Sequence, residues 1–225
     1  MLVLSYFFSV IYLLLLIALF TTNNITDNII LSSIYSFIIV FTTFIYFAKK
    51  YNIEYNIPNF VTTARLIINI FILICVININ EYTDILIFSL IIISLALDGV
   101  DGYLSRYLKQ MTSFGELFDQ EVDNFLILIL TFSLIKNYDY SIFIMCIPLY
   151  RYIFLILIRQ GMISNDILPK SYLRKAICIC TIALLSLCNF YNTVESIRSL
   201  IYIIIVLITY SFIKDTIYLY RRRNV

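Results

Sequence analysis

The stretch DGVDGYLSR, residues 98–106, and the stretch FGELFDQEVD, residues 114–123, together carry four aspartates in a strongly apolar chain. Asp98 and Asp101 are three residues apart, and Asp119 and Asp123 are four apart. On helices, residues at these spacings share one face. Acidic side chains are costly within a membrane and usually functional there, so the four aspartates mark the first candidate site.

The two pairs are expected on neighbouring helices. Asp98 falls late in a predicted helix over residues 84–106, and Asp119 falls early in one over 118–135. We expect a tight loop containing Gly115 to join them, so that the helices pack antiparallel and the carboxylates converge near the cytoplasmic membrane boundary. Clusters of carboxylate oxygens suit Mg²⁺, Mn²⁺ or Ca²⁺. The alternative is a set of helix-capping or salt-bridged aspartates at the membrane interface.

Composition places the chain in a membrane. Of its 225 residues, 62% are hydrophobic and only 13% are charged, whereas soluble domains carry about 25% charged residues. The mean hydropathy is +0.95. A net charge of +2 is too small to argue for nucleic acid, and the absence of histidine excludes Ser–His–Asp triads and histidine metal sites.

The apolar segments predict an all-α integral membrane protein with about eight transmembrane helices. A membrane helix needs about 20 apolar residues. The candidate segments are 2–20, 28–48, 59–80, 84–106, 118–135, 141–159, 172–190 and 198–218. The polar stretch 49–58 divides an N-terminal two-helix extension, residues 1–48, from a core over residues 49–225.

Basic residues predict the orientation, because Lys and Arg concentrate in cytoplasmic loops. One side of the predicted membrane carries Lys49, Lys50, Arg106, Lys109, Arg159, Lys170, Arg174, Lys175, Lys214, Arg221, Arg222 and Arg223. The other side carries only Lys136 and Arg198. We therefore expect both termini and the aspartates to face the cytoplasm.

Small residues gather beside the aspartates. The chain has four glycines, and Gly99, Gly102 and Gly115 all lie in this window. Glycine costs about 1 kcal/mol relative to alanine in a helix, so its concentration here indicates close approach of another helix or of a ligand. Gly102 and Ser105 share the helix side of Asp98 and would leave room for a flat ligand; plain helix packing is the alternative.

A second polar pattern opens the helix expected over 59–80. In IPNFVTTAR, residues 57–65, Pro58 suits a helix start because its missing N–H needs no partner there. Asn59, Thr62 and Arg65 then recur every three residues along one side. The pattern indicates a functional face, with an N-cap and an arginine reaching the interface as the alternative.

The motif Asp98-x-x-Asp101-Gly102-x-x-Ser105-Arg106, followed after eight residues by Gly115-x-x-x-Asp119-x-x-x-Asp123, resembles the signature of the CDP-alcohol phosphatidyltransferases. The family usually has alanine where this chain has Ser105. IPNFVTTAR is similar to the entrance of the family's first core helix. The resemblance covers residues 49 to about 218 and implies a six-helix core preceded by two extra helices.

The resemblance implies a reaction. Such enzymes transfer a phosphatidyl group from CDP-diacylglycerol to an alcohol and release CMP, as phospholipid synthesis requires. Asp98, Asp101 and Asp119 would be metal ligands, and Asp123 both ligand and catalytic base. The cofactors would be two Mg²⁺ or Mn²⁺ ions. Contacts to the CDP moiety are expected from Asn59, Thr62, Gly102, Ser105, Arg106 and Gly115.

The sequence leaves several alcohols open as the acceptor of the phosphatidyl group. Arg151, Arg174, Lys175 and Lys109 could bind an anionic acceptor such as glycerol 3-phosphate. However, phosphatidylglycerophosphate synthases usually show D-P-x-A-D-K where this chain has DQEVDN, residues 119–124. Inositol phosphate, serine, inositol and phosphatidylglycerol therefore remain alternative acceptors.

The resemblance also implies a homodimer in the cell's inner membrane, with the active site facing the cytoplasm. Two other classes of function compete with the transferase. One is a cation or proton transporter that uses the aspartates, and the other is a non-catalytic membrane anchor. Transporters tend to place their sites near the midplane, often with internal repeats, and no repeat is found in this sequence.

Overall fold

The computed structural model describes residues 56–77, 83–164, 172–191 and 195–223, and these residues form helices without strands. In chain order the helices are α3 (Ile57–Ile77), α4 (Thr83–Tyr107), α5 (Ser113–Tyr138), the short 3₁₀-helix η1 (Ile142–Met145), α6 (Cys146–Arg159), α7 (Tyr172–Phe190) and α8 (Glu195–Arg223). The segments expected over 2–20 and 28–48 lie outside the described residues. The all-α prediction is confirmed for the part of the chain described.

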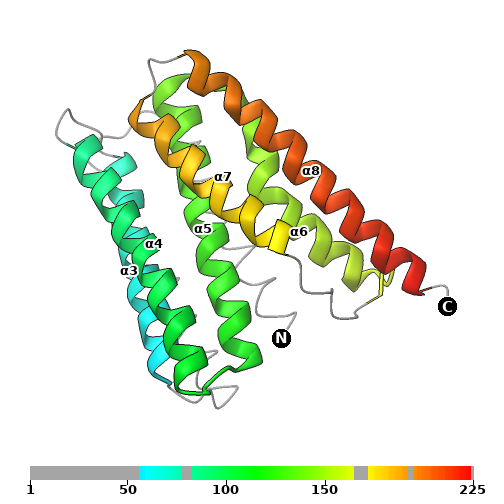
Figure 1. Ribbon diagram of the computed structural model, residues 1–225. Coiled ribbons are helices and arrows are strands. Elements are labelled where there is room, and N and C mark those ends of the chain that lie inside the picture. The colour runs from blue at the N-terminus through cyan, green and yellow to red at the C-terminus, as the bar shows by residue number, and fades with distance from the viewer. Residues whose placement is uncertain (1–55, 78–82, 165–171, 192–194, 224–225) are drawn as a thin grey trace. The chain divides into compact units, whose positions relative to one another are not determined.

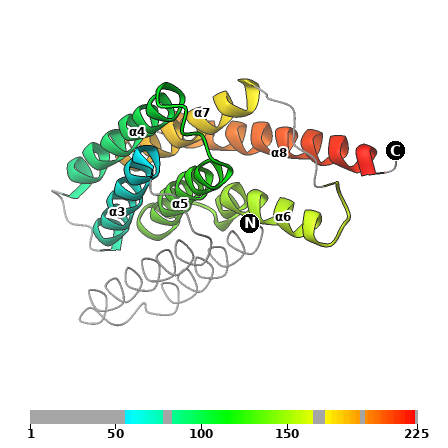
Figure 2. The same cartoon turned by 90° about the horizontal axis from the view of Figure 1, so that it is seen from below.

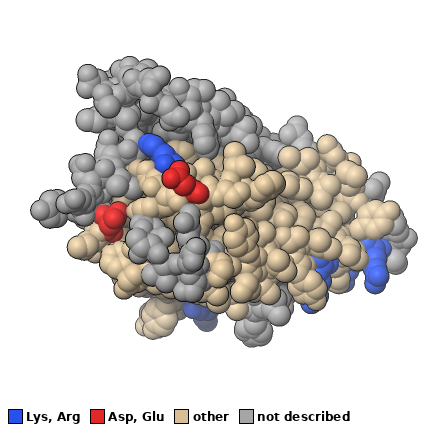
Figure 3. All heavy atoms as spheres, turned by 90° about the horizontal axis from the view of Figure 1, so that it is seen from above, with Lys and Arg blue, Asp and Glu red and all other residues tan. Residues whose placement is uncertain are grey.

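Three of the described helices are long and apolar enough to cross a membrane. Their spans are Ile57–Val76, Asp84–Tyr107 and Ser199–Arg222. At 1.5 Å per residue, a span of 20 residues is about 30 Å long, which matches the hydrocarbon core of a bilayer. Charged side chains are few on the described surface in Figure 3, as a lipid-facing surface requires.

The chain divides into two compact units, Met1–Phe125 and Leu126–Val225. In the first unit, α3 and α4 lie side by side, as Figures 1 and 2 both show. Both helices bury apolar side chains, among them Leu66 and Ile70 of α3 and Ile91 of α4. The first part of α5 completes this unit and carries the second aspartate pair.

In the second unit, α8 contacts both α6 and α7. The Tyr150 hydroxyl of α6 lies 2.7 Å from Thr209 Oγ1 of α8, and the Tyr150 ring packs against Phe212 with centroids 5.0 Å apart. From α7, the Asn189 side-chain amide donates to the Leu130 carbonyl of α5 over 3.3 Å. Polar side chains thus link helices whose remaining contacts are largely apolar.

Several helix boundaries differ from the predicted ones, and the start of α5 is the difference that matters for the site. α5 begins at Ser113, five residues before the expected start at residue 118, and Gly115 lies within its first turn and not in a loop. The Thr112 hydroxyl accepts a hydrogen bond from the Gly115 amide over 3.0 Å. This is an N-terminal capping interaction, and it allows the helix to begin in a polar segment that hydropathy alone assigns to a loop.

Candidate metal and transfer site

Four carboxylates meet at one place in the first unit. Asp98 and Asp101 come from the last part of α4, whereas Asp119 and Asp123 come from the first part of α5. Oxygen atoms of Asp98, Asp119 and Asp123 lie within 4.8 Å of one another, close enough for all three to reach one metal ion. The expected convergence of the aspartates is therefore found in the structure.

A single guanidinium lies among them. Arg65 of α3 is 1% exposed, and its Nη1 atom lies 3.0 Å from Asp98 Oδ1 and 3.2 Å from Asp101 Oδ2. The same atom is 2.5 Å from Asp119 Oδ1, and Nη2 is 2.5 Å from Asp123 Oδ1. All four carboxylates thus surround one positive group, which fits the electrostatic demand of four like charges at short range.

The carboxylates differ in their access to solvent. The Asp101 side chain is 7% exposed, whereas those of Asp98 and Asp119 are each 36% exposed. Asp101 also accepts a hydrogen bond from the Thr62 hydroxyl, 3.0 Å from its Oδ2 atom. Asp101 is thus held by α3, while Asp98 and Asp119 remain partly exposed.

A second polar network lies one helical turn deeper. The buried Asn69 of α3 is four residues after Arg65, and its side-chain amide donates to the Val122 carbonyl of α5 over 3.2 Å. Its Oδ1 atom accepts a hydrogen bond from the Ser94 hydroxyl of α4 over 2.9 Å. One amide therefore links all three helices that carry the site and fixes their relative register.

The glycines have different surroundings. A Cβ atom added at Gly115 would lie 2.8 Å from Asn59 Oδ1, so this glycine leaves room for the Asn59 side chain of α3 beside the first turn of α5. A Cβ at Gly102 would meet nothing nearer than the Arg106 guanidinium at 3.9 Å, and one at Gly99 would meet nothing within 4 Å. Of these three glycines, only Gly115 has close contacts with other described residues that leave no room for a side chain.

The other residues predicted to contact the CDP moiety lie around the same helix ends. Asn59 and Thr62 are buried in the first turns of α3, and the Ser105 hydroxyl donates to the Gly102 carbonyl over 3.1 Å. Arg106 lies exposed in the last turn of α4. Their binding of a nucleotide stays a prediction.

The predicted acceptor residues are distributed over both units. Lys109 is exposed between α4 and α5 and has a left-handed backbone, with φ of 53°. Arg151 is half-buried in α6, and Arg174 and Lys175 belong to the first turn of α7. Of the four, only Lys109 belongs to the unit that carries the aspartates, and an acceptor role for the set stays a prediction.

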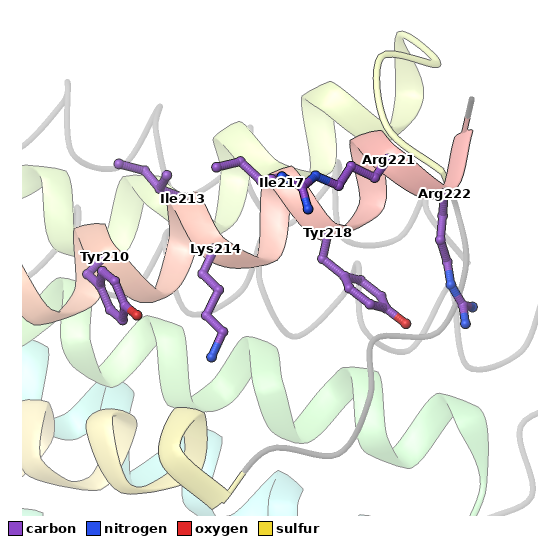
Figure 4. A pocket seen from close by; sticks show the side chains of 7 residues that line it. All are labelled: Tyr210, Ile213, Lys214, Ile217, Tyr218, Arg221 and Arg222. Atoms are coloured by element: carbon purple, nitrogen blue, oxygen red, sulfur yellow. The ribbon is translucent and has the colours of Figure 1, made fainter. Parts of the chain in front are cut away.

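A separate pocket lies along α8. Its volume is about 760 Å³, and its lining residues are Tyr210, Ile213, Lys214, Ile217, Tyr218, Arg221 and Arg222. Figure 4 shows Tyr210, Lys214, Tyr218 and Arg222 on one side of the helix, and the Arg222 guanidinium lies 5.3 Å from the centre of the Tyr218 ring. Tyrosines with basic residues at the end of an apolar helix are typical of a membrane–water interface.

Comparison with known proteins decides the family. The family model for CDP-alcohol phosphatidyltransferase matches residues 55–212, which include every helix that carries the site. The chain belongs to this family. Members of the CDP-alcohol phosphatidyltransferase family depend on metal ions in general, and the aspartates of this chain lie together as a metal site requires.

Two relatives carry a more specific name. The chain is 36% identical over 86 residues to the CDP-diacylglycerol–glycerol-3-phosphate 3-phosphatidyltransferase of Rickettsia prowazekii, a match that covers 38% of this chain and 47% of that protein. The protein of the same name from Rickettsia typhi is 36% identical over 83 residues, 36% of this chain and 46% of the relative. The chain thus matches about half the length of these curated relatives. No solved structure matches it.

Sequence reasoning missed two features of the site. Arg65 was expected on a functional side of its helix but had no assigned partner, and Asn69 was not singled out. Both are polar residues within a long apolar run, at positions that share one face with Thr62. That spacing was the available signal, although it does not say which side chains of other helices they would contact.

Proposed function

We propose that this protein transfers a phosphatidyl group from CDP-diacylglycerol to an alcohol and releases CMP. The supporting observation is that all four signature aspartates contact one buried cationic group between α3, α4 and α5. In the reaction, the acceptor hydroxyl oxygen forms a bond to the β-phosphorus of the donor. The bond from that phosphorus to the oxygen of CMP breaks, and CMP leaves with the electron pair.

The four aspartates would have two roles, metal binding and base catalysis. Asp98, Asp101 and Asp119 would hold the metal ions, two Mg²⁺ or Mn²⁺, with Asp123 as a further ligand. When bound, such ions neutralise the diphosphate and stabilise the departing CMP. Asp123 would also accept the proton of the acceptor hydroxyl, because the chain has no histidine to serve as the base.

The donor, CDP-diacylglycerol, would lie along the start of α3 and the end of α4. Asn59, Thr62, Ser105 and Arg106, with Gly102 and Gly115, would contact the CDP moiety. The surroundings of Gly102 support this placement, because an added Cβ would meet only the Arg106 guanidinium among the described residues, at an ordinary contact distance of 3.9 Å. The Thr62 hydroxyl that bonds Asp101 would then fix a metal ligand as well as border the nucleotide site.

Glycerol 3-phosphate is the acceptor that the names of the Rickettsia proteins support. Arg151, Arg174, Lys175 and Lys109 would supply positive charge for its phosphate. The chain lacks the Pro, Ala and Lys that phosphatidylglycerophosphate synthases usually have around Asp119 and Asp123. The test therefore includes inositol phosphate, serine, inositol and phosphatidylglycerol as competing acceptors.

The membrane arrangement follows from the predicted topology. Eight transmembrane helices would place both termini and the site at the cytoplasmic side of the cell's inner membrane, with residues 1–48 as a two-helix extension of the core. The protein would act as a homodimer. The acyl chains of CDP-diacylglycerol would stay in the bilayer while its head group reaches the aspartates at the interface.

A CMP-release assay tests the proposal. Purified protein is incubated with labelled CDP-diacylglycerol, Mg²⁺ or Mn²⁺ and each acceptor in turn, and the lipid product is identified. Asp123→Asn should lower the rate by about 10²–10⁴, the usual contribution of a general base together with its metal contact. Asp139→Asn is the matched control, since Asp139 is exposed and its left-handed backbone, with φ of 53°, suits asparagine.

Two results would contradict the proposal. One is the absence of CMP release with every acceptor. The other is an ion flux through proteoliposomes that Asp123→Asn abolishes while no lipid product forms, which would favour a transporter. Equal CMP release by Asp123→Asn and by Asp139→Asn would contradict the assigned base and leave the reaction class in place.

A further inference from the structure

Arg65 is a cation buried inside a cluster of its own counter-ions. A guanidinium that is 1% exposed loses nearly all its hydration, which costs several kcal/mol unless charged partners replace the water. Here both terminal nitrogens are engaged by carboxylates, at 2.5–3.2 Å. The arginine and the aspartates therefore stabilise one another, and removing the carboxylates would leave the guanidinium buried without its partners.

The guanidinium contacts the same carboxylates that a metal ion would need. The three carboxylates whose oxygens lie within 4.8 Å of one another, those of Asp98, Asp119 and Asp123, are all in contact with Arg65. A divalent ion takes carboxylate oxygens at about 2.0–2.6 Å. An ion bound by these oxygens would lie within a few ångströms of the guanidinium, and the two positive groups would repel each other.

The arginine also has an incomplete set of partners. Its Nε atom is buried and has no hydrogen-bond partner among the described residues. A guanidinium offers five N–H donors, and the carboxylates engage only its two terminal nitrogens. The contacts that hold Arg65 in place are therefore the ionic ones at its end, and they are made to carboxylates that a metal ion would also need.

We propose that Arg65 is a resident counter-cation: it holds the carboxylate cluster together in the metal-free protein and competes with divalent ions for it. Metal binding then requires the guanidinium to withdraw from the ligand oxygens. The inference rests on the proposed metal site and adds to it a side chain that weakens ion binding and stabilises the free protein.

Metal binding and thermal unfolding of the detergent-purified protein test this without measuring turnover. Mn²⁺ affinity is measured from the electron paramagnetic resonance signal of the free ion, and unfolding is followed in chelator and in excess Mn²⁺. Arg65→Met should bind Mn²⁺ about ten- to a hundredfold more tightly, because a unit positive charge near the ion is removed. It should unfold at a lower temperature in chelator and gain more stability from Mn²⁺ than the wild type.

Two further variants keep the test decisive. Arg65→Lys retains the charge on a more compact head group and should lie between Arg65→Met and the wild type in both measurements, which gives the direction of the effect if the methionine variant does not fold. Arg222→Met removes one positive charge from the exposed end of α8 and should leave Mn²⁺ affinity unchanged, which controls for net charge.

The outcomes are distinguishable. Equal or weaker Mn²⁺ binding by both Arg65 variants would overturn the competition while leaving the metal site intact. Unchanged unfolding in chelator would overturn the role as counter-cation of the free protein. Failure of the wild type and of every variant to bind Mn²⁺ would overturn the proposed metal site and, with it, the competition.

Discussion

Replacing Gly115 by alanine should destabilise the protein through two close contacts of the added Cβ atom. The added Cβ would lie 2.8 Å from Asn59 Oδ1 and 3.1 Å from Thr112 Oγ1, whereas carbon and oxygen atoms in close contact usually lie about 3.3–3.6 Å apart. Asn59 would have to move by about half an ångström, and overpacking of this kind costs about 1–3 kcal/mol. Alanine recovers at most about 1 kcal/mol of helix propensity, so the net loss is about 0–2 kcal/mol.

The control is Gly99→Ala, because a Cβ at Gly99 meets nothing within 4 Å and should gain the propensity without the clash. The two alanine variants should therefore differ by about 1–3 kcal/mol in the free energy of unfolding, measured in detergent. In the double variant Asn59→Ala/Gly115→Ala the closer of the two contacts is gone, so the two changes should be non-additive. Equal stability of the two alanine variants, with additive effects in the double variant, would refute the close approach of the Asn59 side chain to Gly115.

Matched pairs of hydroxyl residues give two further predictions. Thr62→Val removes the hydrogen bond to Asp101 and should weaken metal affinity about 10–100-fold. The control Thr63→Val should leave metal affinity unchanged, because the Thr63 hydroxyl bonds a carbonyl of its own helix. Equal Mn²⁺ affinity of the two variants would show that the hydrogen bond to Asp101 is unimportant. Ser94→Ala leaves the buried Oδ1 atom of Asn69 without its donor and should lower the free energy of unfolding by about 1–3 kcal/mol. The control Ser89→Ala, on the exposed side of α4, should be neutral in thermal unfolding. Equal losses of stability in the two variants would contradict the role of the buried network.

The spacing of the aspartates predicted their grouping because helical periodicity alone decides it. Asp98 with Asp101, and Asp119 with Asp123, share helix faces whatever the exact helix ends are. Packing of the two helices against α3 then brings both faces together, as the contacts to Arg65 show. The early start of α5 did not disturb this grouping, because it lengthens the helix without rotating the face that carries the acids.

The partners of the polar residues on α3 could not be predicted in the same way. Arg65 and Asn69 are recognisable as polar positions on an apolar helix, but their contacts depend on how α4 and α5 are rotated against α3. The wrong placement of Gly115 has a similar cause: the segment before residue 118 is polar, and a hydroxyl cap, not hydropathy, decides that the helix starts at Ser113.

The most direct test of the carboxylate site is CMP release from CDP-diacylglycerol by the wild-type protein in chelator and after Mg²⁺ or Mn²⁺ is restored. If the four aspartates hold the ions on which the reaction depends, release should fall to the background of a protein-free control in chelator and return when the ion is added back. Undiminished release in chelator would mean that the aspartates of α4 and α5 are neutralised by Arg65 alone, and that their grouping serves the fold and not the chemistry.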